Sequence, residues 1–456
     1  MIEVLKILVF VVALGAATLS RRWSLAVVGF FLPLASLLPE ASVSGLNAPN
    51  VLLLPLIMHA FQAGRAPGSS DRKDPLFVPC LLLLGMVFVS LMRVQLDPHQ
   101  PVEFLQRREL YNNALFFKGM VIPFVGYFCA RRLVRDVDSA RLAVASVMCG
   151  YFLQSFSGAG DFLHGTGLDD RATGQFSSSG QLGHFVAAYS MIPAAAIMQG
   201  TRGRLLVAAI LAMLVSVMGL FGSLSRGALV AFGGGITAMA LAKRSLWIVL
   251  IVAVVFTAPT WLPQDYVARF HESVTKDRTG LSRVPGFQSA EEFDVVNREA
   301  RIQFWKAGMR MVADKPILGV GLGRFPYALP NYGYTGGKHR SAHNVTVGLA
   351  AECGILAALA HLAILVIIAT HTLRLAWTAR EKLPRTFGLG MFGAIVAFAL
   401  SGMVMPEFYR GTYSGPYFIL TGVVFNLLFF ENAARKTATV ATQPRPLNAA
   451  TAAGAS

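Results

Sequence analysis

Long apolar runs separated by short polar segments make up most of this chain. Thirteen runs are candidate membrane helices, near residues 4–20, 23–39, 48–63, 76–93, 114–131, 140–157, 181–199, 204–222, 227–242, 245–262, 342–370, 387–405 and 414–431. About 20 apolar residues in a helix cross the roughly 30 Å hydrocarbon core of a bilayer. A spanning segment must satisfy its backbone hydrogen bonds internally, as a helix does. The pattern therefore predicts an all-α polytopic membrane protein.

The first two runs are short, and only Arg21 and Arg22 separate them. They can form one hairpin that does not fully cross the bilayer, so we expect about twelve transmembrane helices, within a range of 12–13. The first run lacks a clear basic region and a small-residue cleavage site, so we expect it to be retained.

Composition agrees with this interpretation. The chain is 54% hydrophobic and 14% charged, whereas a soluble domain has about 25% charged residues. The net charge of +16 does not indicate a nucleic-acid partner, because the basic residues lie mostly in short loops and no basic patch alternates with aromatic residues. The four cysteines lie in or beside apolar runs without a CxxC pair, which favours small core residues over a disulfide framework or a metal site.

Lys and Arg residues gather in alternate loops of the predicted series. These residues are Arg65, Arg72 and Lys73; Arg131, Arg132 and Arg135; Arg202 and Arg204; Lys243 and Arg244; Arg374, Arg380, Lys382 and Arg385; and Arg435 and Lys436. The positive-inside rule predicts that these loops are cytoplasmic. The loops at 94–113, 158–180, 223–226, 263–341 and 406–413 then face outward, into the periplasm of a Gram-negative cell.

This topology divides the chain into four regions. They are the N-terminal transmembrane helices (1–262), a large external loop (263–341), the C-terminal transmembrane helices (342–431) and a disordered cytoplasmic tail (432–456). Loops as long as the external one are uncommon unless they are functional or disordered. We expect it to carry short helices, one of them at 294–313, where apolar residues recur at helical spacing. Its sequence Gly319-Val-Gly-Leu-Gly323 lacks the context of a nucleotide-binding loop and predicts a tight turn.

Several polar residues of the predicted outer face lie beside membrane segments, where ionisable groups are costly and usually functional. Arginine suits a pyrophosphate because its planar fork offers paired donors and stays charged. A histidine at the membrane edge suits a general base, because its ordinary pKa is near neutrality. The candidates are His343 and Asn344 after the large loop; Arg171, Arg226 and Arg301; and Glu407, Tyr409 and Arg410 in the last external turn.

Each candidate also has a structural interpretation. Arg226 can be an interfacial residue that reaches toward the headgroups, and His343 with Asn344 can simply begin a helix. The remaining structural pairings are Arg301 with Glu299 or Asp294, Arg171 with Asp169 and Asp170, and Glu407 with Arg410. For His184 and His339 the structural interpretation is favoured.

An ordered series of motifs resembles the O-antigen ligase and polymerase superfamily. The series comprises Ser223-Leu-Ser-Arg-Gly227, Arg301-x-x-x-Trp305, Asp314-Lys-Pro-Ile-Leu-Gly-Val-Gly-Leu-Gly-Arg-Phe325, and His343-Asn344 followed after nine residues by Gly354. The last is similar to the ligase signature His-Asn/Ser/Gln-x9-Gly-x-x-Gly/Thr/Tyr, whose final position here is Ala357. Earlier, Arg171-Ala-Thr-Gly174-Gln-Phe176 resembles the family's Arg-x-x-Gly-x-Phe, without the Asn that often follows it.

The resemblance implies a metal-independent glycosyltransferase of the inner membrane that uses no cofactor and acts on the periplasmic face. The donor would be a glycan on undecaprenyl pyrophosphate, and the acceptor a sugar hydroxyl of the lipid A–core oligosaccharide. His343 would be the general base, and Arg226, Arg301 and Arg171 would bind the pyrophosphate. Asn344, Glu407, Tyr409 and Arg410 would position these groups or contact the acceptor. Single-displacement chemistry would invert the anomeric centre.

Two alternatives stay open. An O-antigen or exopolysaccharide polymerase would use the same donor with another lipid-linked glycan as acceptor, and the motifs do not separate it well from a ligase. A secondary transporter or a lipid-linked glycan flippase would also have about twelve helices, but such folds often show paired halves with interrupted helices, and this sequence does not.

Overall fold

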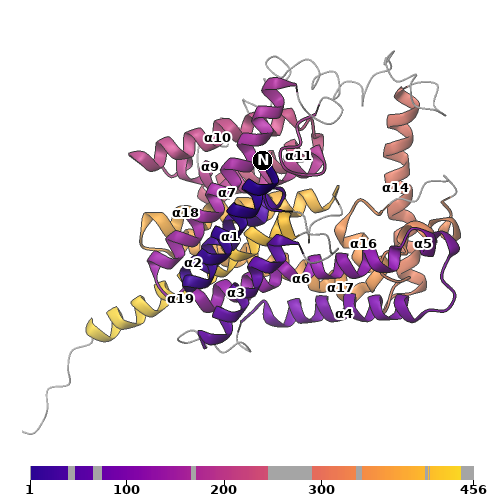
Figure 1. The fold of residues 1–456 in the computed structure, drawn as a ribbon, viewed down its shortest axis with the longest axis horizontal. Coiled ribbons are helices and arrows are strands. Elements are labelled where there is room, and N and C mark those ends of the chain that lie inside the picture. The colour runs from indigo at the N-terminus through magenta and orange to yellow at the C-terminus, as the bar shows by residue number, and fades with distance from the viewer. Residues whose placement is uncertain are drawn as a thin grey trace, which may run out of the picture.

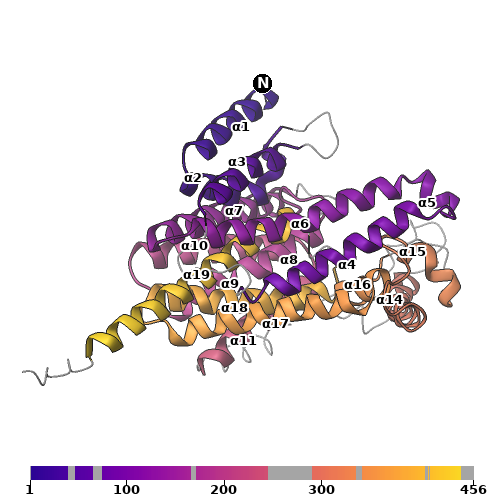
Figure 2. The same cartoon turned by 90° about the horizontal axis from the view of Figure 1, so that it is seen from below.

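The computed structural model describes residues 2–39, 47–64, 74–165, 171–244, 290–334, 341–405, 409 and 411–442. Across these ranges the chain forms helices joined by turns, as the apolar pattern predicts. The predicted run at 245–262 lies outside the described residues. Figures 1 and 2 show a bundle whose helices run mostly along one long direction.

Among the described residues, eight helices are long and apolar enough to cross a membrane. They are Phe77–Leu96, Glu109–Leu133, Val137–His164, Ser179–Met198, Arg204–Gly222, Ile355–Thr378, Lys382–Gly402 and Gly411–Arg435. Each coincides with a predicted run or the greater part of one. A multi-pass membrane protein is therefore confirmed, whereas the predicted count of about twelve crossings is not.

The N-terminal helices are shorter. Helix α1 (Ile2–Leu19) packs on α2 (Arg21–Phe31) and α3 (Ala48–Gln62), in keeping with the predicted hairpin. The second run does not continue as one α-helix, because the chain tightens into the 3₁₀ helix η1 (Leu32–Leu37) at Pro33. Helix α3 has 15 residues, which gives it a length of only about 22 Å.

The loops gather at two ends of the bundle. At one end, Arg131 Nε lies 2.8 Å from Asp74 Oδ2, and Lys382 Nζ donates to Gly200 O at 2.6 Å. These contacts bring together the loops that the sequence predicts to be cytoplasmic. Helix α19 (Gly411–Thr442) also extends to this end and continues past residue 432, where the sequence predicts a disordered tail.

The opposite end carries the predicted external segments. Asn113 Nδ2 donates to Leu322 O at 2.8 Å, which joins the 94–113 loop to the large loop. Figure 2 places at this end the helices α5 (Val102–Gln106), α14 (Ala290–Asp314), α15 (Phe325–Ala328) and α16 (Val345–Cys353). The helix predicted at 294–313 is confirmed as α14. Which membrane face each end occupies stays a prediction.

The predicted single segment at 342–370 is wrong, because two helices replace it. Helix α16 ends at Cys353, and α17 (Ile355–Thr378) begins after Gly354, whose φ of 92° is open mainly to glycine. The amide of Ile355 donates to Pro316 O at 2.8 Å, so the break lets the large loop dock on the helix junction. A Cβ at Gly354 would lie 1.9 Å from Ile317 O, which leaves no space for a side chain.

The glycine-rich turn of the large loop docks beside this break. Gly319, Gly321 and Gly323 have φ values of 64°, 114° and 73°, which confirms the predicted turn. The amides of Val320 and Gly321 donate to Ala351 O and Glu352 O, at 2.7 and 3.0 Å. The turn thereby satisfies carbonyl groups at the end of α16 that would otherwise lack partners.

Replacing Gly354 by Ala should destabilise the protein strongly. Gly354 has φ 92° and ψ 164°, a backbone region essentially confined to glycine that costs other residues of order 1–3 kcal/mol, and the contact with Ile317 O adds to this cost. The control is Gly85→Ala on α4 (Phe77–Leu96), where an added Cβ meets nothing within 4 Å. Thermal unfolding in detergent should show a lower midpoint for Gly354→Ala and little change for Gly85→Ala. Equal midpoints would contradict the account of the helix break.

Candidate functional site

Arg226 begins a helix at the end of the bundle that carries the predicted external loops. Helix α10 (Arg204–Gly222) stops at Gly222, and α11 (Arg226–Lys243) starts after a three-residue turn. Ser225 caps α11, its hydroxyl accepting from the amide of Ala228 at 3.3 Å. The Arg226 side chain is exposed. Since a helix N-terminus carries partial positive charge and free N–H groups, Arg226 and the start of α11 together suit an anion.

Arg171 holds this turn in place. Its Nε and Nη2 donate to Ser223 O at 3.1 and 2.9 Å, and Ala172 N donates to Gly222 O at 2.9 Å. The guanidinium thus occupies the negative end of α10. Arg171 is held at the turn that precedes Arg226, because its guanidinium donates hydrogen bonds to backbone carbonyl groups of that turn. Its predicted contact with pyrophosphate stays a prediction.

His343 and Asn344 lie at the start of α16. Asn344 is the N-cap, and its Oδ1 accepts from Val347 N at 3.1 Å. Trp305 on α14 donates from Nε1 to Ala342 O at 3.0 Å. The Phe304 ring lies parallel to the His343 ring, with centroids 6.5 Å apart. Helix α14 therefore packs directly on the segment that carries the predicted base.

Arg301 lies one turn before Trp305 on the same helix, and its side chain is exposed. The helical geometry of α14 accounts for the spacing of the motif Arg301-x-x-x-Trp305. The tryptophan fixes the helix against residue 342, and the arginine projects from the same helix near the start of α16.

Two turns of the candidate site are strained. In the described part of the chain, four residues other than glycine have positive φ: Arg108, Leu224, Arg244 and His343. Leu224 lies in the turn before Arg226, and His343 is the predicted base. Such conformations cost of order 1–3 kcal/mol each and concentrate at functional sites.

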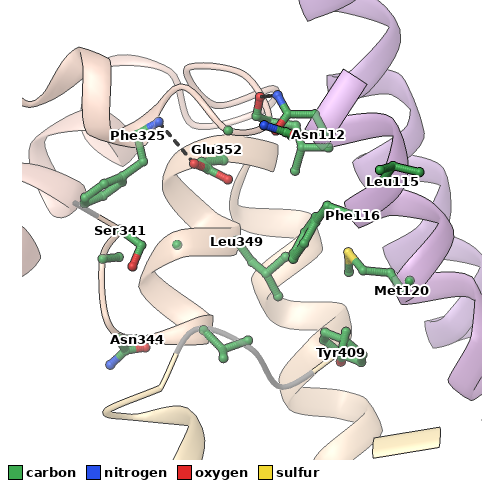
Figure 3. Close-up of a pocket in the computed structure, with 17 residues that line it drawn as sticks. Asn112, Leu115, Phe116, Met120, Phe325, Ser341, Asn344, Leu349, Glu352 and Tyr409 are labelled. Atoms are coloured by element: carbon green, nitrogen blue, oxygen red, sulfur yellow. Dashed lines mark hydrogen bonds between the residues drawn. The ribbon is translucent and has the colours of Figure 1, made fainter. Parts of the chain in front are cut away.

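A cavity of about 640 Å³ opens beside the start of α16 (Figure 3). It lies between α6 (Glu109–Leu133) and α16, and Leu322 and Gly323 at the end of the glycine-rich turn also line it. Its lining includes Asn112, Asn113, Phe116, Leu322, Phe325, Ser341, Ala342, Asn344, Leu349, Glu352 and Tyr409. The residues on both sides of His343 therefore line the cavity.

Tyr409, a candidate from the last external turn, is one wall of this cavity. The side chain is buried, and its hydroxyl lies 2.6 Å from Nδ1 of His361 on α17. Sequence reasoning missed His361, because one histidine in an apolar helix gives no signal of its partner. The other candidates of this turn, Glu407 and Arg410, lie outside the described residues, as does His339.

Two described residues after α18 (Lys382–Gly402) contact the two groups of candidates. Val404 lies against the start of α11, where a Cβ on Gly227 would be 2.9 Å from its Cγ2. Five residues later, Tyr409 lines the cavity together with Asn344. Val404 therefore lies at the start of α11, and Tyr409 lies at the cavity beside His343.

His184 takes a structural place. It is buried in α8 (Ser179–Tyr189), and its Nδ1 lies 2.8 Å from the hydroxyl of Ser401. This geometry agrees with the structural interpretation favoured for it.

Glu352 is a cavity residue that the sequence analysis did not select. Its Oε1 accepts from the amide of Phe325 at 3.1 Å. Burial raises the pKa of this carboxyl to about 7, although the backbone N–H groups of Gly323 and Phe325 lower it. Its sequence signal is that it is a lone acidic residue in an otherwise apolar run. Ionisable residues in such runs are usually functional.

A comparison with known protein families agrees with the resemblance that the sequence motifs indicate. Residues 211–362 match the family model described as O-Antigen ligase. The matched region contains Arg226, Arg301 and His343 and extends beyond Gly354 into α17, whereas Arg171 and Tyr409 lie outside it. No curated protein matches the chain.

The raised pKa of Glu352 predicts a pH-dependent stability. A pKa raised from 4.5 to about 7 means that the folded protein binds this proton more tightly than the unfolded chain. The resulting stabilisation is fully present below pH 4.5 and is lost as the pH rises through about 7. The unfolding midpoint of the wild type should therefore fall more between pH 5 and pH 8 than that of Glu352→Gln.

The control for this experiment is Glu109→Gln, which changes another carboxylate at the same end, bonded to Tyr327. It should keep the pH dependence of the wild type. Identical slopes for Glu352→Gln and the wild type would show that Glu352 does not titrate in this range.

Proposed function

We propose that this protein is an O-antigen ligase, because residues 211–362 match the family model of that description. It would transfer a glycan from undecaprenyl pyrophosphate to a sugar hydroxyl of the lipid A–core oligosaccharide. The observation that carries the proposal is the packing of α14 on the start of α16. This packing brings the helix of Arg301 to His343 within the matched region.

The reaction is a single displacement at the anomeric carbon of the donor. The acceptor oxygen forms a bond to that carbon, the bond from the carbon to the pyrophosphate oxygen breaks, and the anomeric configuration inverts. His343 takes the proton of the acceptor hydroxyl, and undecaprenyl pyrophosphate leaves with the bonding electrons. A positioned histidine suits this role because its ordinary pKa lies near the working pH.

Negative charge develops on the leaving pyrophosphate, so fixed cations aimed at it stabilise the transition state more than the ground state. Arg226 supplies one such cation together with the N-terminus of α11. Arg301 supplies another from α14. Arg171 supports them by fixing the turn through the carbonyl of Ser223. Guanidinium groups in these positions would stabilise the charge of the pyrophosphate, as a divalent cation does in other transferases. The reaction would then be metal-independent.

The contacts of the basic loops support an orientation for this chemistry. Since the Lys- and Arg-rich loops meet at one end of the bundle, the positive-inside rule makes that end cytoplasmic. The opposite end, with His343 and the cavity, would then face the periplasm from the inner membrane. Both lipid-linked substrates would reach it laterally from the bilayer.

Purified protein, undecaprenyl-pyrophosphate glycan and lipid A–core should suffice for transfer in the presence of EDTA and without nucleotide. His343→Ala should lose nearly all activity, since no other group would take the proton. The product is identified by gel mobility and mass spectrometry. Lengthening of the lipid-linked glycan, with lipid A–core left unmodified, would contradict the ligase proposal and identify a polymerase. No reaction of either kind would favour a transporter.

Conservative replacement of Arg226 or Arg301 by lysine should impair transfer. Arg226→Lys and Arg301→Lys keep the charge but lose the paired donors of the guanidinium, so each should lose most of its transfer activity. The matched control is Arg310→Lys on α14, whose exposed guanidinium makes a bond of 3.0 Å to Tyr332 O. It should keep nearly full activity. Normal transfer by both Arg226→Lys and Arg301→Lys would refute their role at the pyrophosphate.

A further inference from the structure

The cavity between α6 and α16 has two kinds of wall (Figure 3). Phe116 on α6 and Leu349 on α16 give apolar surface, whereas Asn112, Ser341 and Glu352 give hydrogen-bonding groups. Its volume of about 640 Å³ lies within the ordinary range of small-ligand sites, roughly 300–1,000 Å³. A sugar ring has matching surfaces, with hydroxyl groups around its rim and C–H groups on its faces.

Glu352 is the charged group of this cavity. An ionised carboxylate accepts about four hydrogen bonds, and the backbone N–H groups of Phe325 and Gly323 supply only part of them. Within the described ranges, no Lys or Arg forms an ion pair with Glu352. A partly buried carboxylate without a cation is costly unless hydrogen-bond donors satisfy it. The hydroxyl groups of a bound sugar are donors of the right kind.

The backbone around Glu352 is fixed in advance. Its carbonyl oxygen accepts from the Ser90 hydroxyl at 2.8 Å and from the amide of Gly321 at 3.0 Å. On the opposite wall, Asn113 is tied to Leu322 O at 2.8 Å. Polar groups held by surrounding structure bind a ligand without a large ordering cost.

The helix also sets how far Glu352 lies from the proposed chemistry. Glu352 is eight residues after the cap residue Asn344 on α16, which corresponds to about 12 Å along the helix axis. That distance is too long for Glu352 to reach a proton at His343, but it suits contact with a neighbouring sugar of the same glycan.

We propose that this cavity binds a sugar ring adjacent to the reacting one, and that Glu352 determines specificity by accepting hydrogen bonds from its hydroxyl groups. The proposal rests on the ligase function proposed above. The ring can belong to the donor glycan or to the acceptor core, which present the same chemistry to the cavity.

Steady-state kinetics of Glu352→Gln test the proposal in two arms. One arm varies the lipid-linked donor at saturating lipid A–core, and the other varies the acceptor at saturating donor. Replacing the carboxylate weakens charge-assisted bonds, so one of the two KM values should rise at least about tenfold while kcat changes little. The arm in which KM rises identifies the source of the sugar. Unchanged KM values in both arms, or a loss confined to kcat, would overturn the proposal.

Two further variants separate binding from folding. Phe116→Ala removes an apolar wall from a partly exposed position and should raise the same KM. Glu109→Gln, outside the cavity, should leave both KM values unchanged. If Glu352→Gln raised KM and Phe116→Ala did not, the sugar would not lie between these two walls, and the proposal would fail.

A binding measurement distinguishes this failure from failure of the ligase function. Saturation-transfer NMR of detergent-solubilised protein with lipid-free O-antigen and core oligosaccharides needs no turnover. Binding by the wild type that Glu352→Gln weakens would support the cavity even if transfer were absent. Equal binding by both proteins would refute the role of Glu352 even if transfer occurred.

Discussion

The close approach of two backbones at Gly354 is the constraint on which this end of the molecule depends. Because Gly354 has no side chain, residues 316–321 dock on the junction between α16 and α17, and the glycine-rich turn pairs with the last carbonyl groups of α16. Helix α16 is thereby held at its C-terminal end. Its N-terminal end carries His343 and is held by Trp305. One short helix fixed at both ends thus positions the proposed base and the cavity beside it.

The proposed site is assembled from segments far apart in the sequence. Arg171 reaches the carbonyl of Ser223, and α14 reaches Ala342. After α18, Val404 contacts the start of α11 and Tyr409 lines the cavity. Strained backbone at Leu224 and His343 is tolerated because capped helices follow both turns.

Much of the fold follows from local pattern. The run at 204–222 coincides with α10, and the helix of the large loop appears as α14, because apolar length and periodicity are properties of the segment itself. The break at Gly354 was not predictable, since one glycine in an apolar run does not reveal that the carbonyl of Ile317 packs against it. The partners of Arg171 and the orientation of Glu352 likewise arise from tertiary contacts. The motifs therefore selected residues for the site, but they could not show which of them bind backbone and which face the cavity.

The most direct test of the account is an experimental structure of the protein with undecaprenyl pyrophosphate bound. The diphosphate should lie within hydrogen-bonding distance of the guanidinium groups of Arg226 and Arg301, on the side of α16 where His343 precedes the helix. A diphosphate at the opposite end of the bundle, beside Arg131 and Lys382, would contradict it. So would a diphosphate at the expected end that neither Arg226 nor Arg301 contacts.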